Sequence, residues 1–287
     1  MIQPIDKCYK FLTPTKLKAP FGWVGGKSKL AQNIVELMPP HKRYVEVFGG
    51  GLSVLYAKPS RKDIMSKDYN LGDFIDFKGR KDKYVEVIND TNNDLINLHT
   101  IIKTSPQTFS LYLNNMLCSR EIFERIKRGR FKPKNKIEKA VLYYCLLTFS
   151  FASKGDNFAM CKARSPKNIY KDYSIWSERL KGVCIENMDF RKLIKEYDNE
   201  DSLFYLDPPY VGTENYYKMQ RDFGIQEHRD LADILHHIKG KFILSYNDCK
   251  LVREQYKDFR INQTKEVRYS MNVQVRKVAK EVLIMNY

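Results

Sequence analysis

Short apolar runs alternate with amphipathic stretches along most of the chain, and this alternation predicts its fold. The apolar runs are rich in valine, isoleucine and aromatic residues, as buried strands are. They cover residues 44–48, 84–88, 183–186, 202–206, 242–246, 259–265 and 281–286. Between them, apolar residues recur at helical spacing over 29–38, from 52 onward, over 91–104 and over 226–238. Strands that alternate with helices predict an α/β fold with a mostly parallel sheet.

The pattern changes after residue 104. Two helical segments are predicted next, at roughly 107–128 and 136–150, and the second is apolar nearly all round. Such a helix is expected at the buried centre of a small helical domain. We therefore predict a main α/β domain formed by residues 1–104 and 182–287, with a helical domain of residues 105–181 inserted into it.

Two of the predicted strands end in residues that suit a nucleotide site. The strand 44–48 is followed by Gly49-Gly50-Gly51 and a helix, and glycines let a backbone approach a ligand closely. The next strand, after a polar and aperiodic insertion at 58–83, ends in Asn89-Asp90. An acidic residue at this place binds ribose hydroxyls in dinucleotide folds. The alternative is that Asp90 only caps the following helix, a role also open to Asn92 or Asn93.

The stretch from Phe21 to Ser28 contains Gly25-Gly26-Lys27 just before a predicted helix. It is not a P-loop, because Phe21 stands where the first glycine of that motif is required and no strand leads into it. A helix N-terminus preceded by glycines, with the added charge of Lys27, can still accept a carboxylate or a phosphate. The alternative is simple helix entry.

The most distinctive stretch is Asp207-Pro208-Pro209-Tyr210, directly after the strand 202–206. Each proline fixes its own φ angle and extends the residue before it, so the loop is stiff. It places one carboxylate, backbone carbonyls and one aromatic ring at the carboxyl edge of the sheet. These groups can hold a planar base that carries an exocyclic amine, since the oxygens accept its N–H bonds and the ring stacks. The alternative is a strand-ending turn with a surface tyrosine.

Composition adds a partner class to this fold. The formal net charge is +16, from 50 Lys and Arg against 34 Asp and Glu, which favours a polyanion: nucleic acid first, a membrane surface second. No apolar run is long enough to span a bilayer and no signal peptide is evident, so we expect a cytoplasmic protein that does not bind a membrane. The six cysteines are scattered, which fits a reducing compartment, and neither they nor the histidines have metal-ligand spacing.

A basic stretch at 149–170, rich in serine, asparagine and aromatic residues, is the predicted DNA-reading hairpin or loop. Long basic side chains contact phosphates, while asparagine and arginine also pair with base edges. The candidates in this stretch are Lys154, Asn157, Lys162 and Arg164, and a second basic turn contributes Arg268, Arg276 and Lys277. For any single lysine, a solvated basic face is an equally good explanation.

Several of these stretches together resemble one family, the Dam-like DNA adenine N6 methyltransferases of the class alpha, D12 type. The resemblance rests on Phe21 to Lys27, Glu46 to Gly51, Asn89-Asp90, Asp189-Phe190, Asp207 to Tyr210 and Glu281-Val282-Leu283-Ile284, which occur in the family's order from about residue 20 to 287. The chain departs from the family at Val24, where Ala is usual, and at Val47, where Pro is usual. The segment 149–170 also lacks a match to the family's GATC-reading segment, so the resemblance implies no target sequence.

The resemblance implies a Rossmann-like S-adenosylmethionine-dependent methyltransferase sheet with an inserted helical target-recognition domain. It also implies base flipping in double-stranded DNA, with Asp207, Pro208, Pro209 and Tyr210 as the catalytic loop. The cofactor-binding residues that it implies are Trp23, Gly25, Gly26, Lys27, Glu46, Phe48, Gly49, Gly50, Asp90, Asp189, Phe190 and Asp207. In this mechanism Asp207 and the Pro208 carbonyl accept the two N6 hydrogens, and no metal is needed.

Three alternatives remain beside this interpretation. A methyltransferase acting on protein glutamine or RNA would share the sheet, but its tetrapeptide usually begins with Asn, and a cytosine N4 enzyme usually has Ser there. The third alternative is a DNA-binding module with an inactive cofactor site, against which Lys27, Asp90 and Asp207 argue. We expect a monomer or weak dimer, either solitary or paired with a restriction nuclease.

Overall fold

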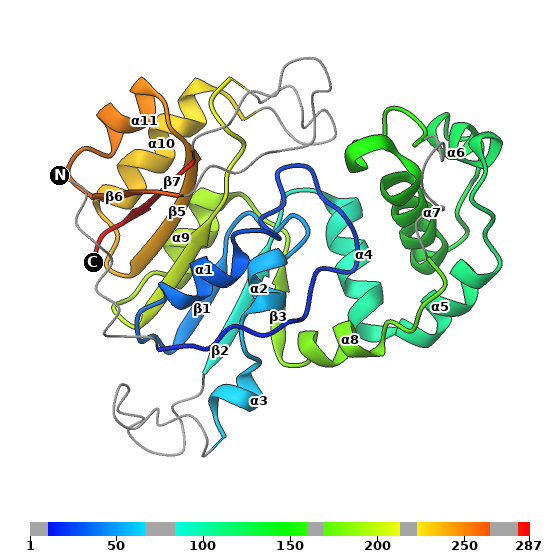
Figure 1. The fold of residues 1–287 in the computed structure, drawn as a ribbon, viewed down its shortest axis with the longest axis horizontal. Helices are drawn as coiled ribbons and strands as arrows, with labels where there is room; N and C mark the ends of the chain where they lie inside the picture. The colour runs from blue at the N-terminus through cyan, green and yellow to red at the C-terminus, as the bar shows by residue number, and fades with distance from the viewer. Residues whose placement is uncertain (1–10, 67–83, 160–168, 213–222, 265–280) are drawn as a thin grey trace.

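The computed structural model describes residues 11–66, 84–159, 169–212, 223–264 and 281–287, and it contains one mixed sheet (Figure 1). The strands are β1 (Arg43–Glu46), β2 (Val85–Asn89), β3 (Val183–Glu186), β4 (Ser202–Leu206), β5 (Lys241–Asn247), β6 (Arg260–Gln263) and β7 (Glu281–Met285). Their order across the sheet is β3-β2-β1-β4-β5-β7-β6. The first five are parallel, while β7 runs antiparallel to both neighbours. The prediction of a mostly parallel α/β sheet is confirmed.

Both faces of the sheet are buried, each by its own hydrophobic core. Side chains alternate between faces along a strand, and β4 shows this: Leu203 and Tyr205 join one core, while Phe204 and Leu206 join the other. Because every residue of β4 is buried, its sequence is a continuous apolar run without polar alternation. Buried on both faces, β4 is a rigid base for the loop that follows it.

Eleven α-helices are found in the described part of the chain. They are α1 (Ala31–Glu36), α2 (Ser53–Ala57), α3 (Arg61–Ile64), α4 (Asn93–Thr104), α5 (Pro106–Asn114), α6 (Arg120–Lys127), α7 (Lys136–Phe149), α8 (Ser174–Leu180), α9 (Phe190–Tyr197), α10 (Ile225–His236) and α11 (Lys250–Gln255). A short 3₁₀ helix, η2 (Phe151–Ser153), follows α7. The apolar residues of α9, α10 and α11 belong to one core, and those of α1, α2 and α4 belong to the other.

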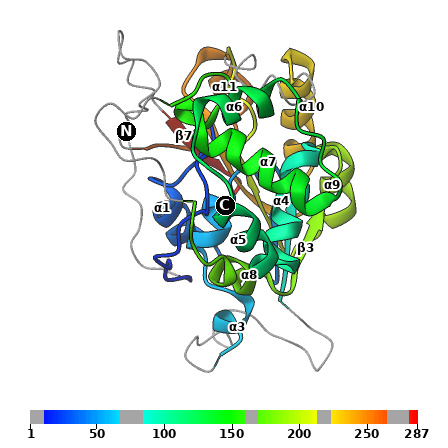
Figure 2. The same ribbon diagram turned by 90° about the vertical axis from the view of Figure 1, so that its right-hand side faces the viewer.

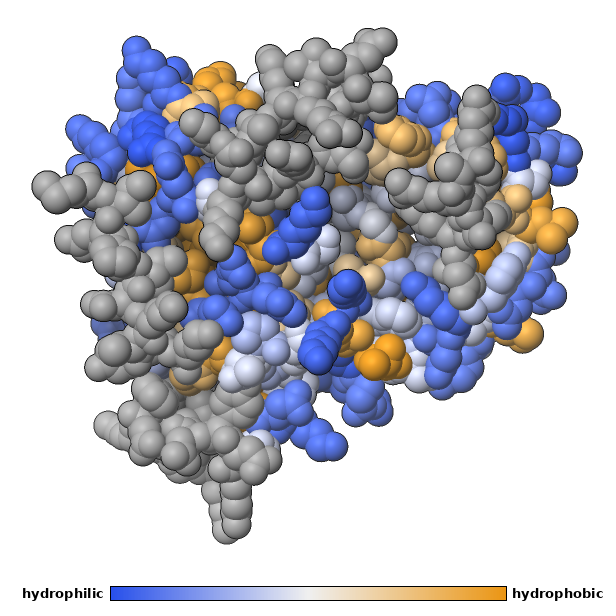
Figure 3. Space-filling view, viewed as in Figure 1, coloured by the Kyte–Doolittle hydropathy of each residue, from blue (hydrophilic) through white to orange (hydrophobic). Residues whose placement is uncertain are grey.

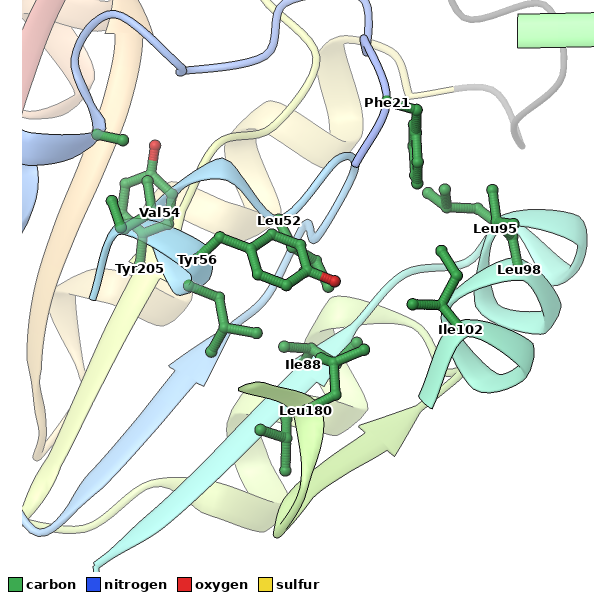
Figure 4. Packing of buried hydrophobic residues seen from close by; sticks show 14 of the residues in the cluster. Phe21, Leu52, Val54, Tyr56, Ile88, Leu95, Leu98, Ile102, Leu180 and Tyr205 are labelled. Carbon is green, nitrogen blue, oxygen red and sulfur yellow. The ribbon is translucent and has the colours of Figure 1, made fainter. Parts of the chain in front are cut away.

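The helices α5, α6 and α7 form a separate lobe beside the sheet, with α4 and α8 between the two (Figure 1). In Figure 2 this lobe faces the viewer. The helix α7 lies at the centre of the lobe and packs against α4, α5 and α6. Figure 4 shows how α4 joins the parts: Leu95, Leu98 and Ile102 point toward Phe21 and Ile88. All five residues are buried in one continuous core.

The prediction of a single helical segment at 107–128 is wrong, because α5 and α6 are separate helices. The Asn115 side chain donates to the Leu111 carbonyl at 3.0 Å, as asparagine does when it competes with the helical backbone. Ser119 then caps α6 by accepting a hydrogen bond from the Ile122 amide at 3.4 Å. Polar side chains thus end one helix and start another within five residues.

The predicted polar insertion at 58–83 is only partly described, since residues 67–83 lie outside the described part. Its beginning is not a solvated loop. Lys58 is buried and its ammonium lies 2.8 Å from the Glu86 carboxylate, and α3 follows, capped by Ser60 and Asp63. Lys58 is thus a polar residue in the sequence, but its pairing with Glu86 of β2 makes it part of the buried core.

Candidate active site

A pocket opens at the carboxyl ends of β1, β2 and β4. In the register of the sheet, Glu46 pairs with Ile88 on one side and with Tyr205 on the other. The residues two positions after these three are Phe48, Asp90 and Asp207, which therefore lie level with one another beyond the edge of the sheet. The predicted site residues that line the pocket are Trp23, Gly26, Lys27, Glu46, Phe48, Gly49, Gly50, Asp90, Asp189, Phe190, Asp207 and Pro209.

The glycine turn after β1 forms one wall of the pocket and is packed under Trp23. Gly50 has a φ angle of +50°, in the left-handed region that favours glycine. A Cβ atom at Gly50 would lie 2.7 Å from the Trp23 indole ring, so any side chain there would displace the tryptophan. The position therefore needs glycine for its backbone angle as well as for space.

Asp90 is buried at the base of this turn. Its carboxylate accepts hydrogen bonds from the Gly50 amide at 3.0 Å and from the Asn92 amide at 2.9 Å. Burial raises the pKa of Asp90, and these backbone amides lower it. The structure assigns the cap of α4 to Asn92, whose side chain accepts from the Asp94 and Leu95 amides. Asp90 is thus held as an oriented acceptor in the pocket wall rather than serving as the helix cap.

Three aromatic rings pack against one another and line one part of the pocket, and the space beside them is an apolar slot. The ring centroids of Phe48, Phe190 and Phe223 lie 5.7 to 5.8 Å from one another. Beside them Asp189 caps α9, and its carboxylate also accepts from the Arg191 guanidinium at 2.9 Å. An apolar slot with a carboxylate at its edge suits a flat ring that carries an N–H donor.

Lys27 and Asp207 form an ion pair at the opposite end of the pocket. The Lys27 ammonium lies 2.7 and 2.8 Å from the two Asp207 carboxylate oxygens and donates to the Gly25 carbonyl at 2.9 Å. Gly25 therefore acts through Lys27 and does not line the pocket itself. Burial raises the pKa of Asp207 to about 6, with Lys27 lowering it and Glu281 adding to the rise. At neutral pH the Asp207 carboxylate is ionised and can accept hydrogen bonds.

Glu46 is a second buried carboxyl group in the pocket wall. It accepts hydrogen bonds from the Tyr44 hydroxyl at 2.8 Å and from the Leu55 amide at 3.0 Å. Burial raises the pKa of Glu46 to about 8, although both hydrogen bonds lower it. Glu46 is therefore mostly protonated at pH 7, whereas Asp207, with a pKa of about 6, is mostly ionised.

The remaining residues of the tetrapeptide hold its shape. Pro208 and Pro209 are buried, and the loop continues into Val211, whose amide and carbonyl bond to the Asn247 side chain at 3.2 and 3.1 Å. Tyr210 is half-buried, with the Lys27 ammonium 4.8 Å from its ring centroid. Its hydroxyl donates to Glu281 at 2.7 Å. The loop is thus fixed to β5 and β7 as well as to β4.

Among the site residues that the sequence did not mark as functional candidates, three bear most on the chemistry. Phe223 and Arg191 line the pocket, and Glu281 joins Tyr210 and Lys27. Phe223 follows a polar loop and shows no pattern that marks it. Arg191 directly follows the Asp189-Phe190 pair, and Glu281 begins one of the stretches that resemble the family. Their positions in the sequence could therefore have marked them as site residues.

The predicted DNA-reading residues are described only in part. Lys154 and Asn157 lie just after α7, in a short turn closed by an antiparallel bridge between Ser150 and Phe158. The others, Lys162, Arg164, Arg268, Arg276 and Lys277, lie outside the described residues. Further exposed basic residues follow α6 in the same lobe, among them Arg128, Arg130 and Lys132. The hydrophilic surface of this lobe appears at the upper right of Figure 3.

Two further expectations concern metals and membranes. Across the ranges that the structure describes, no group of three or more His, Cys, Asp or Glu side chains is placed to hold a metal ion. The same ranges include no helix that is both long enough and apolar enough to cross a bilayer.

The comparisons with known proteins agree with this geometry. The family model of D12 class N6 adenine-specific DNA methyltransferases matches residues 23–270. The chain is 23% identical to the DNA adenine methylase of Haemophilus influenzae, with 95% of both chains covered. It is also 23% identical to the DNA adenine methylase of Escherichia coli K12, over 94% of this chain and 95% of that one. The type II methyltransferase M.FokI of Planomicrobium okeanokoites is 25% identical over 97% of this chain, which spans 44% of that protein.

Proposed function

Because the chain belongs to the D12 class N6 adenine-specific DNA methyltransferase family, we propose that S-adenosylmethionine is its methyl donor, held in the pocket at the ends of β1, β2 and β4. Membership of the family makes it an adenine-specific DNA methyltransferase with a methyl donor. The pocket supports this particular donor through three features that match its three parts. They are an aromatic slot, a buried acceptor and a carboxylate paired with a lysine.

The side chains present fit each part of S-adenosylmethionine. The slot of Phe48, Phe190 and Phe223 would take the adenine ring, with Asp189 at its edge. Asp90 would accept from the ribose hydroxyls, since both of its oxygens are fixed by backbone amides. The glycine turn under Trp23 leaves backbone rather than side chains against the ligand.

The Lys27 end of the pocket is proposed to do the chemistry. When bound, S-adenosylmethionine supplies an electrophilic methyl group on a sulfonium. The Asp207 carboxylate and the Pro208 carbonyl accept the two N6 hydrogens of the target adenine, which orients the amine and leaves its lone pair free to attack. Tyr210 stacks on the base, which must leave the duplex because its amine cannot be reached inside the stack. Positioning and electrostatics carry the acceleration.

One observation carries this proposal: the position of Asp207. The sheet register sets it level with Phe48 and Asp90, so that acceptor, slot and ribose site share a single pocket. Lys27 holds both of its oxygens, which keeps a half-buried carboxylate ionised and oriented. An inactive cofactor site would still need the slot and the ribose acceptor, but it would not need an ionised acceptor held at Asp207.

Replacing Asp90 with alanine tests the cofactor site. We expect S-adenosylmethionine to bind about 10- to 100-fold more weakly, because a hydrogen bond to a charged group contributes about 1.5–3 kcal/mol. Isothermal titration calorimetry on the folded variant measures the effect, and Asp233→Ala, which removes an exposed carboxylate on α10, is the matched control. Unchanged affinity in Asp90→Ala would reduce Asp90 to a support for the glycine turn.

We propose the helical lobe, residues 105–181, as the target-recognition domain, with Lys154 and Asn157 among its DNA contacts. A protein that neutralises phosphates releases counterions, so its affinity falls linearly with salt on a log–log scale. With a net charge of +16, affinity for a non-target duplex should fall steeply between 50 and 200 mM salt, by roughly 10³-fold if six phosphates are contacted. Fluorescence anisotropy at several salt concentrations measures the slope, and a flat response would assign the basic excess to another purpose.

A further inference from the structure

Glu281 is a buried carboxylate that the proposed mechanism does not use. It is the first residue of β7 and stands in register with Asn247 of β5. Its carbonyl accepts from the Thr264 amide at 3.0 Å, which fixes the backbone on its other side. The side chain is 1% exposed. The sheet would be complete with an apolar residue here, so the presence of a carboxylate calls for a separate explanation.

The side chain of Glu281 joins the two halves of the proposed catalytic loop. One oxygen, Oε1, accepts from the Tyr210 hydroxyl at 2.7 Å and lies 3.8 Å from the Lys27 ammonium. The same ammonium contacts both oxygens of Asp207 and lies close to the Tyr210 ring. Glu281, Tyr210, Lys27 and Asp207 therefore form one connected network, contributed by three separate segments of the chain.

Such a network fixes the orientation of the Tyr210 ring and of the Asp207 carboxylate. A hydrogen bond to an ionised carboxylate is shorter and stronger than one between neutral groups, so it restrains the Tyr210 ring. The Lys27 ammonium is shared between two carboxylates, which limits how far it can move toward either. A small change at Glu281 would thus reach both the ring that stacks on the base and the carboxylate that accepts its amine.

Resting on the proposed function, we propose that Glu281 is a positioning residue for methyl transfer, holding the Tyr210 ring by its hydroxyl and sharing Lys27 with Asp207. It does not touch the base or the methyl donor in this proposal. It acts through Tyr210 and through the electrostatic environment of Asp207. The contact with Tyr210 is tested by the rate and the fluorescence of the flipped base, and the effect on Asp207 is tested by the pH profile of the rate.

The electrostatic route predicts a shift in the pH profile. Asp207 is faced by Lys27, by Glu281, by Glu46 of β1 and by the Tyr205 hydroxyl of β4. Burial raises the pKa of Asp207 to about 6 and the negative charge of Glu281 adds to the rise, while Lys27 lowers it. Because Asp207 must be ionised to accept the amine hydrogens, the rate is lost as the pH falls through about 6. Removing the charge of Glu281 should lower the pKa of Asp207 and move this acid limb to lower pH.

The test uses Glu281→Gln, Tyr210→Phe and the double variant of the full-length chain. Mapping methylated sites first identifies an adenine that the wild-type enzyme methylates, and a duplex containing this adenine is the substrate for the rate measurement. For the fluorescence measurement, 2-aminopurine replaces that adenine in the same duplex. We expect each single variant to lower the single-turnover rate and the fluorescence of the flipped base about five- to tenfold, because a charged hydrogen bond becomes neutral or is lost. The double variant should be no worse than the poorer single one, since both changes act on the same contact. Glu200→Gln, at an exposed site, should match the wild type.

The pH profile separates positioning from a purely structural role. Glu281→Gln should move the acid limb to lower pH, and Tyr210→Phe should leave it in place. Additive effects of the two changes, or an acid limb that does not move in Glu281→Gln, would overturn the proposal. If the wild-type chain methylates no adenine in duplex DNA, it is the proposed function that fails, and this outcome is visible before any variant is made.

Discussion

Asp207→Ala should lower the rate of methyl transfer by about 10²–10⁴-fold while leaving binding to duplex DNA nearly unchanged. The substitution removes the acceptor that orients the target amine, but it keeps Pro208, Pro209 and Tyr210 in place. DNA affinity depends mostly on basic residues elsewhere on the surface. Single-turnover transfer of labelled methyl groups measures the first effect, and fluorescence anisotropy measures the second.

Two further variants make this result interpretable. Asp207→Ala leaves the buried Lys27 ammonium without its closest partner, so a loss of folding could imitate a loss of chemistry. Asp207→Asn keeps one oxygen acceptor and the shape of the side chain, and we expect a rate between those of the alanine variant and the wild type. Asp201→Ala, at an exposed site before β4, is the matched control. A folded Asp207→Ala that transfers methyl groups at a near-normal rate would remove Asp207 from the mechanism.

Glu86→Ala should lower the free energy of unfolding by about 3–5 kcal/mol. Glu86 accepts hydrogen bonds from the Lys58 ammonium at 2.8 Å and from two nitrogens of the Arg179 guanidinium at 2.8 and 2.9 Å. All three side chains are buried, so the substitution would leave two cations without their common partner. Urea unfolding measures the loss. Glu200→Ala, at an exposed site, should change stability by less than about 0.5 kcal/mol.

The same cluster predicts a dependence of stability on pH. Burial raises the pKa of Glu86, but Lys58 and Arg179 outweigh it and hold the pKa at about 2, below the ordinary value of 4.5. The contribution of Glu86 is therefore fully present above about pH 4.5 and is lost as the pH falls through about 2. In Glu86→Gln this part of the acid dependence should disappear. A loss below about 1 kcal/mol in Glu86→Ala would show that the buried charges contribute little to folding.

Much of the fold could be predicted because its signals are local. After Ser202 the run from Leu203 to Leu206 has no charged or strongly polar residue, which is typical of a strand buried on both faces. The proline pair that follows restricts the backbone, and the glycines after β1 allow a turn with a positive φ angle that other residues rarely adopt. Residues of this kind need no distant partner to reveal their structure, so the pocket edge was predictable from them.

The rest depends on contacts between distant parts of the chain. Lys58 is a polar residue in the sequence, and only its pairing with Glu86, which also pairs with Arg179, places it in the core. Phe223 enters the site because α10 packs against the same face as α9, which no local pattern states. Glu281 lies within a stretch that resembles the family, but its contact with Tyr210 spans 71 residues. Partners that far apart in sequence are set by the topology of the sheet rather than by any local spacing.

The most direct test of the account is to identify which atom receives the methyl group and whether Asp207 is required. Duplex DNA is incubated with labelled S-adenosylmethionine and either the wild-type chain or Asp207→Ala, then digested to nucleosides and analysed by mass spectrometry. We predict labelled N6-methyldeoxyadenosine with the wild type and a signal about 10²–10⁴-fold lower with Asp207→Ala. Label in N4-methyldeoxycytidine or on protein, or equal labelling of adenine by both chains, would contradict the account.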